Sequence, residues 1–102
     1  MANSVQNSVK VSFNDTTYKF VLENVLETDV KTVRRIYIIL VNGVESDSRI
    51  IYTTMKGETR ACYEVLVPTE KNPNVYTTPY KQYYEKGFPM SITFDIIKFL
   101  NK

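Results

Sequence analysis

Carboxylates and one thiol are the side chains of this 102-residue chain that could take part in chemistry. Glu58 with Glu64, or Glu85 with Asp95, could supply the general acid and base that glycoside cleavage needs. No spacing rule selects either pair. Cys62 lies inside the segment RACYEVL, where we expect a buried, inert thiol rather than a thiolate nucleophile.

The residues that usually complete a catalytic or metal site are missing. The chain has no histidine, so the common Ser-His and Cys-His nucleophile pairs cannot form. One cysteine without histidine cannot make a structural zinc site, and Glu45 with Asp47 provides too few oxygen ligands for a calcium loop. A dinucleotide fingerprint needs three glycines within one short run, and the chain has only three glycines in all. We therefore expect a protein that is not an enzyme and binds no cofactor and no metal.

Composition favours one small domain. Hydrophobic residues make up 43% of the chain, enough for a core without disulfide or metal support. We expect residues 1–8 to be loose and residues 9–102 to form a single globular domain. The formal net charge of +2, from 13 basic and 11 acidic residues, gives only a weak attraction to polyanions.

The chain shows no sign of secretion or membrane insertion. Its first ten residues contain no apolar segment of the signal-peptide type, and the single Cys62 cannot form an internal disulfide. The longest apolar run, IYIILV, is too short to cross a bilayer as a helix. We expect a cytoplasmic protein with no membrane partner. Eight tyrosines with no Trp or His are typical of AT-rich coding sequence, as in small proteins of low-GC bacteria and of phages, which act in an infected bacterial host.

Alternating apolar residues predict strands over most of the chain. Asn42-Gly43 is the residue pair that best supports a tight hairpin turn, and it separates two of these strands. The expected strands are 9–13, 18–22, 35–42, 48–55, 59–67 and a doubly buried one at 91–100. The expected core comprises Val11, Phe13, Phe20, Leu22, Ile36, Ile38, Leu40, Ile51, Val65, Ile92, Phe94 and Ile96.

Helix signals occur in two segments. Thr78 as N-cap, Pro79 as first helical residue and Gly87 as C-terminal glycine predict a short Tyr-rich helix at 79–86. At 25–34 the apolar period favours a second helix, whereas several poor helix formers oppose it. We expect an α+β fold dominated by an antiparallel sheet of five or six strands, with the second helix left open.

A binding function remains after these exclusions, and a protein partner is the first expectation. Tyrosine is enriched at protein interfaces, and the long loop 68–79 leads into the Tyr-rich segment. We expect a phage-type inhibitor or accessory factor that blocks a larger protein. Its expected partner-binding residues are Tyr76, Tyr80, Lys81, Tyr84 and Lys86.

Two other functions stay open. A single-stranded nucleic-acid binder would stack bases on sheet tyrosines and hold phosphates with basic residues. The residues expected for it are Tyr37, Tyr52, Tyr63, Arg35, Arg49, Arg60 and Lys56. A structural subunit of an assembly would instead associate with copies of itself as a homo-oligomer, without any ligand.

Overall fold

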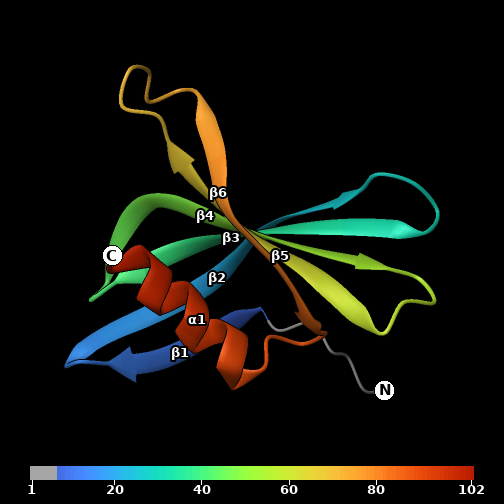
Figure 1. Ribbon diagram of the computed structural model, residues 1–102, viewed down its shortest axis with the longest axis horizontal. Coiled ribbons are helices and arrows are strands. Elements are labelled where there is room, and N and C mark those ends of the chain that lie inside the picture. The colour runs from blue at the N-terminus through green and yellow to red at the C-terminus, as the bar shows by residue number, and fades with distance from the viewer. Residues whose placement is uncertain (1–6) are drawn as a thin grey trace.

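The computed structural model describes residues 7–102, which form six antiparallel strands and one helix (Figure 1). Each strand pairs with the next along the chain, so the order in the sheet is β1-β2-β3-β4-β5-β6. The expected β-dominated α+β class is confirmed. The elements are β1 (Ser8–Phe13), β2 (Thr16–Glu27), β3 (Thr32–Val41), β4 (Val44–Met55), β5 (Arg60–Pro68), β6 (Tyr76–Glu85) and α1 (Met90–Leu100).

Tight turns make neighbouring strands pair. Asn42 and Gly43 have φ values of 50° and 83°, as a type I′ turn requires, and they connect β3 to β4 as predicted. Asn14 and Asp15, with φ values of 52° and 63°, turn the chain between β1 and β2. The five strands expected before residue 68 are therefore confirmed, and the second to fourth are longer than expected.

The start of the sheet includes part of the segment expected to be loose. Residues 1–6 lie outside the described residues. The Leu22 N–H donates to the carbonyl oxygen of Asn7 at 2.8 Å, and β1 begins at Ser8. The globular part of the chain therefore starts slightly earlier than expected.

The helix left open at 25–34 does not form. β2 continues to Glu27, and a short turn leads into β3. The pairing register shifts between Leu22 and Asn24, so a bulge puts Leu22 and Val25 on the same face of the sheet. This three-residue spacing imitates a helical period. The poor helix propensity of the segment was the better indication.

β6 replaces the helix predicted at 79–86, and that prediction was wrong. Residues Tyr80 to Glu85 pair one by one with β5. Tyrosine and threonine favour strands, and Pro79 is tolerated because β6 is an edge strand. Pairing with a distant segment therefore overrides the local cap signals. Gly87, with φ of 93°, lies in the connection to α1.

α1 occupies the segment predicted as the last strand, which was also wrong. Its buried residues, Ile92, Thr93, Ile96 and Ile97, have the spacing of one helical face. Isoleucine and phenylalanine had favoured a strand, but packing against the sheet decides the outcome. No helix within residues 7–102 is long and apolar enough to cross a membrane.

α1 lies across one face of the sheet, which we call the covered face (Figure 1). The Phe94 ring lies 6.0 Å from that of Phe13 on β1, and the Phe99 ring lies 5.2 Å from that of Tyr80 on β6. The helix therefore reaches from one edge strand to the other. The core beneath it comprises Val11, Tyr18, Phe20, Tyr37, Ile39, Ile50, Tyr52, Ala61, Tyr63, Val65, Phe88, Ile92, Ile96 and Ile97.

The predicted core is correct except on β3 and at Ile51 of β4, which is buried but lies opposite Ile36 on the other face of the sheet. Tyr37 and Ile39 are the buried residues there, whereas the predicted residues belong to the opposite face, which we call the open face: Ile36, Ile38 and Leu40. Both alternate sets of IYIILV are apolar, so the sequence does not determine which set meets the helix. Predicted residues that are buried are Val11, Phe20, Ile51, Val65, Ile92 and Ile96, and those packed against the core are Phe13, Leu22 and Phe94.

Candidate functional site

The three tyrosines expected to stack bases lie in the core. The exposed fractions of Tyr37, Tyr52 and Tyr63 are all 0%. Phe88 has a left-handed backbone, with φ of 58°, and its ring centroid lies 5.0, 5.2 and 5.1 Å from theirs. The prediction that these rings form a stacking surface is therefore wrong, because the connection to α1 covers them.

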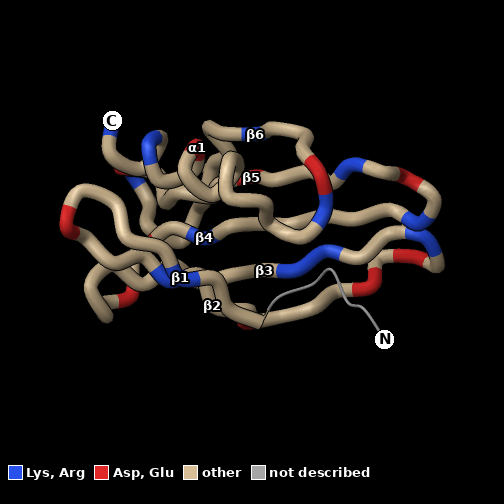
Figure 2. The backbone as a smooth tube through the Cα atoms, turned by 90° about the horizontal axis from the view of Figure 1, so that it is seen from below, with Lys and Arg blue, Asp and Glu red and all other residues tan. Residues whose placement is uncertain are grey.

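The basic residues expected to hold phosphates are scattered. Arg49 forms ion pairs with Glu45 at 2.9 Å and Glu23 at 3.5 Å. Arg35 donates to a threonine hydroxyl of β4 and lies over the Tyr52 ring. Figure 2 shows charges of both signs at the β2–β3 and β4–β5 ends of the sheet. The other two members of the set are exposed near the β4–β5 turn: Lys56 and Arg60.

Strand β6 carries the residues expected to bind a protein partner, but it divides them between its two sides. Tyr80 and Tyr84 lie on the covered side and are half-buried. Lys81 is exposed on the open side. Tyr76, at the start of the strand, is 44% exposed, and Lys86 follows its end. The five residues therefore follow one edge of the sheet and not one face of a helix.

A shallow hollow of about 380 Å³ lies between β6 and α1, and we call it the edge groove. Burial raises the pKa of Tyr80, and the negative charge of Asp95 raises it further. Beside the groove runs the backbone edge of β6, to which no other strand of residues 7–102 is paired. The groove is lined by Tyr80, Gln82, Tyr84, Asp95, Lys98, Phe99 and Lys102.

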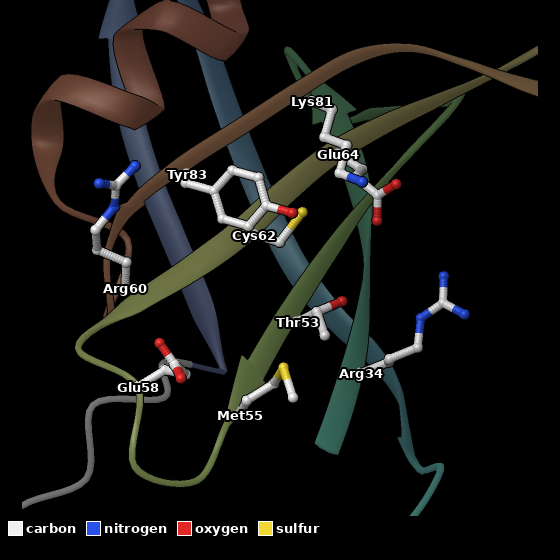
Figure 3. A pocket seen from close by; sticks show the side chains of 9 residues that line it. All are labelled: Arg34, Thr53, Met55, Glu58, Arg60, Cys62, Glu64, Lys81 and Tyr83. Carbon is white, nitrogen blue, oxygen red and sulfur yellow. The ribbon is translucent and has the colours of Figure 1, made fainter. Parts of the chain in front are cut away.

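The open face carries a second hollow, of about 520 Å³, which sequence reasoning missed (Figure 3). We call it the open-face hollow. Five of its residues had been singled out, but for separate reasons and not as one site: Glu58, Arg60, Cys62, Glu64 and Lys81. Four strands contribute to it, so no pattern within one strand reveals it. It is lined by Arg34, Thr53, Met55, Glu58, Arg60, Cys62, Glu64, Lys81 and Tyr83.

One row of cross-strand neighbours runs through the open-face hollow. Arg34 pairs with Thr53, Thr53 with Cys62, and Cys62 with Tyr83. Figure 3 shows the Tyr83 hydroxyl beside the Cys62 sulfur, with Arg34 and Arg60 on opposite sides of them. Cys62 is half-buried rather than fully buried as expected, and burial raises the pKa of its thiol. The sulfur is therefore protonated and a poor nucleophile at neutral pH.

The carboxylates considered for acid and base chemistry fall into two cases. Glu58 and Glu64 both line the open-face hollow. Glu85 is the cross-strand neighbour of Arg60 on the open side of β6, whereas Asp95 lines the edge groove on the covered side. Within residues 7–102, no three His, Cys, Asp or Glu side chains lie close enough together to hold a metal ion.

Comparison with known proteins identifies no relative. No protein-family model, no curated protein and no solved structure matches the chain. The functional argument therefore starts from the unpaired edge of β6 and from the edge groove beside it.

Proposed function

We propose that this chain is a small, non-catalytic binding protein that captures a protein partner along the free edge of β6. The observation that carries the proposal is that β6 pairs with β5 on one side and with no described strand on the other. An extended segment of a partner can add to such an edge through main-chain hydrogen bonds. An inhibitor or accessory factor of phage type would block a larger protein in this way.

Tyrosine side chains support docking at the same edge. Tyr76 is 44% exposed where the edge begins. Tyr80 and Tyr84 are half-buried in the edge groove, where the Tyr80 ring already packs on Phe99. Tyrosines held in this way offer a large contact area while losing little conformational freedom on binding. Strand addition would supply affinity, and the groove would supply selectivity for the partner's side chains.

The charge distribution also favours a protein over a polyanion. The net charge is only +2, and Lys98 and Lys102 share the edge groove with Asp95. A nucleic-acid site normally gathers cations of one sign along the bound strand. We place the partner inside the cell, because the half-buried Cys62 is a free thiol that a reducing compartment preserves.

The experiment compares two variants, each of which places one alanine and one lysine on one of the two edge strands. Immobilised wild-type protein is used to capture proteins from cell extract. Tyr76→Ala/Gln82→Lys alters exposed residues on β6, and Ser8→Ala/Ser12→Lys alters exposed residues on β1. We expect the β6 variant to lose about ten-fold or more of the captured partner, and the β1 variant to retain it.

Three results would contradict the proposal. Full capture by the β6 variant would remove β6 from the docking site. Equal loss in both variants would indicate a general effect of the substitutions. If the only protein captured is the chain itself, β6 pairs with a second copy and the structural-subunit function takes precedence.

A further inference from the structure

We propose that the open-face hollow binds a small organic anion that carries a planar ring, of the nucleoside monophosphate class. This proposal does not depend on partner capture at the edge groove, because the two hollows lie on opposite faces of the sheet.

The size of the hollow suits a ligand of this class. Its volume of about 520 Å³ falls within the range of small-molecule sites, and its floor is formed by side chains of low polarity. Met55, Thr53 and Cys62 present a thioether, a methyl group and a protonated thiol. Such a floor accommodates an organic ring and gives a bare inorganic ion little to bind.

Three cations supply the site for the anionic group. Arg34, Arg60 and Lys81 line the hollow, and Figure 3 shows the two arginines on opposite sides of it. Both ion pairs found within residues 7–102 involve Arg49, so these three cations are not committed to a carboxylate there. A guanidinium presents two parallel donors to a phosphate or carboxylate. The cations that line the hollow are therefore able to hold one anionic group of a ligand.

Tyr83 is the side chain that would bind the planar ring of the ligand. This side chain is 52% exposed although it lies beside the half-buried Cys62. Exposed aromatic rings bind the planar faces of nucleobases by stacking, with little dependence on the base. The Lys81 nitrogen lies 5.9 Å from the Tyr83 ring centroid. An anion on Lys81 therefore brings a ring attached to it within reach of Tyr83.

The two acidic residues of the hollow restrict the ligand further. Glu58 and Glu64 accept hydrogen bonds and repel a second negative group. They favour a ligand with a single anionic group and several donors, and they disfavour a fatty acid or a polyphosphate. A nucleoside monophosphate meets this requirement, because its sugar hydroxyls and base N–H groups are the donors.

The test is an NMR titration of the isotope-labelled full chain with uridine monophosphate, uridine and inorganic phosphate in parallel. We expect uridine monophosphate to shift the amide signals of residues 34, 53, 62 and 83, and to bind about ten-fold or more tightly than either fragment. If inorganic phosphate binds as tightly as uridine monophosphate, the hollow is only a nonspecific anion site, which would contradict the proposal. No saturable shift would overturn the proposal outright.

Matched variants identify which side chains contribute to the binding of uridine monophosphate. Lys81→Gln and Tyr83→Leu should each weaken binding of uridine monophosphate about ten-fold or more, whereas Lys98→Gln makes the same change on the covered side and should have no effect. The amide spectrum of each variant reports whether it is folded. A short peptide containing glutamate is added as a competitor. Binding of this peptide as tight as that of the nucleotide would assign the hollow to carboxylates and contradict the proposal.

The β6 variant Tyr76→Ala/Gln82→Lys separates this proposal from partner capture. Neither residue lines the open-face hollow, so the variant should bind uridine monophosphate as wild type does. Loss of nucleotide binding in this variant would contradict the assignment of the ligand to the open face.

Discussion

The hydroxyl of Tyr63 on β5 accepts a hydrogen bond from the N–H of Phe88 at 3.1 Å, across 25 residues of sequence. The same hydroxyl donates to the carbonyl oxygen of Glu85 at 2.5 Å. One phenol therefore fixes both the end of β6 and the connection that brings α1 onto the sheet. The neighbouring Tyr52 hydroxyl accepts from the Gly87 N–H at 2.7 Å and holds the same connection.

Removing this hydroxyl should destabilise the fold. Tyr63→Phe keeps the ring but leaves a buried N–H and a carbonyl oxygen without their partner, which costs about 1–3 kcal/mol. The free energy of unfolding in urea measures the loss. Tyr76→Phe, at a tyrosine that is 44% exposed, is the control and should change stability by less than about 0.5 kcal/mol. Equal effects at the two positions would contradict the role assigned to Tyr63.

Stability should fall at alkaline pH because of the buried phenols. Burial raises the pKa of Tyr37 to about 12, and burial also raises the pKa of Tyr63. A tyrosine in the unfolded chain ionises near pH 10. Burial of the neutral Tyr37 phenol therefore contributes fully to the stability of the fold below about pH 10. This contribution is lost as the pH rises from about 10 to about 12.

Unfolding free energies measured across this pH range test the prediction. Tyr37→Phe should be less sensitive to pH than wild type, because it has no phenol to ionise at that position. A wild-type protein in which every phenol titrates near pH 10 while the chain stays folded would contradict the burial of Tyr37.

Phe88 combines a buried ring with a left-handed backbone, and two substitutions separate these effects. Phe88→Ala and Phe88→Gly both remove the ring and should cost about 3–5 kcal/mol. Because φ is 58°, glycine relieves a backbone cost of about 1 kcal/mol that alanine retains. We expect the glycine variant to be the more stable of the two in thermal or urea unfolding. The opposite order would contradict the backbone conformation.

The β3–β4 turn offers a test of conformation alone. Gly43 has φ of 83°, and an added Cβ would meet nothing within 4 Å. Gly43→Ala should therefore cost about 1 kcal/mol through backbone conformation and not through a clash. Gly43→Asn should cost less, because asparagine tolerates the left-handed region. Equal losses in the two variants would be evidence against a type I′ turn.

The hairpins could be predicted from the sequence because their signals are local. Asn42-Gly43 specifies its turn, and the alternation from Val9 to Phe13 specifies a strand with one buried face. The bulge after Leu22 was not predictable, because one extra residue in β2 changes the alternation without a distinctive residue type.

The surroundings of β6 could not be predicted because they depend on distant segments. Thr78, Pro79 and Gly87 carry valid cap signals, but pairing with β5 is the stronger interaction. Because β6 was predicted as a helix, Tyr80 and Tyr84 were expected on one helix face, whereas they line the edge groove. The same error prevented prediction of the open-face hollow, which includes residues of β6. Arg34 and Tyr83 become part of one site only when the order of four strands is known.

The most direct test of partner capture at β6 is site-specific photo-crosslinking in cell extract. A photoreactive residue replaces Gln82, which is exposed in the edge groove, or Lys10, which is exposed on the opposite edge strand β1. We predict one discrete crosslinked protein from position 82 and none from position 10. The same crosslinked protein from both positions, or from position 10 alone, would contradict docking at β6.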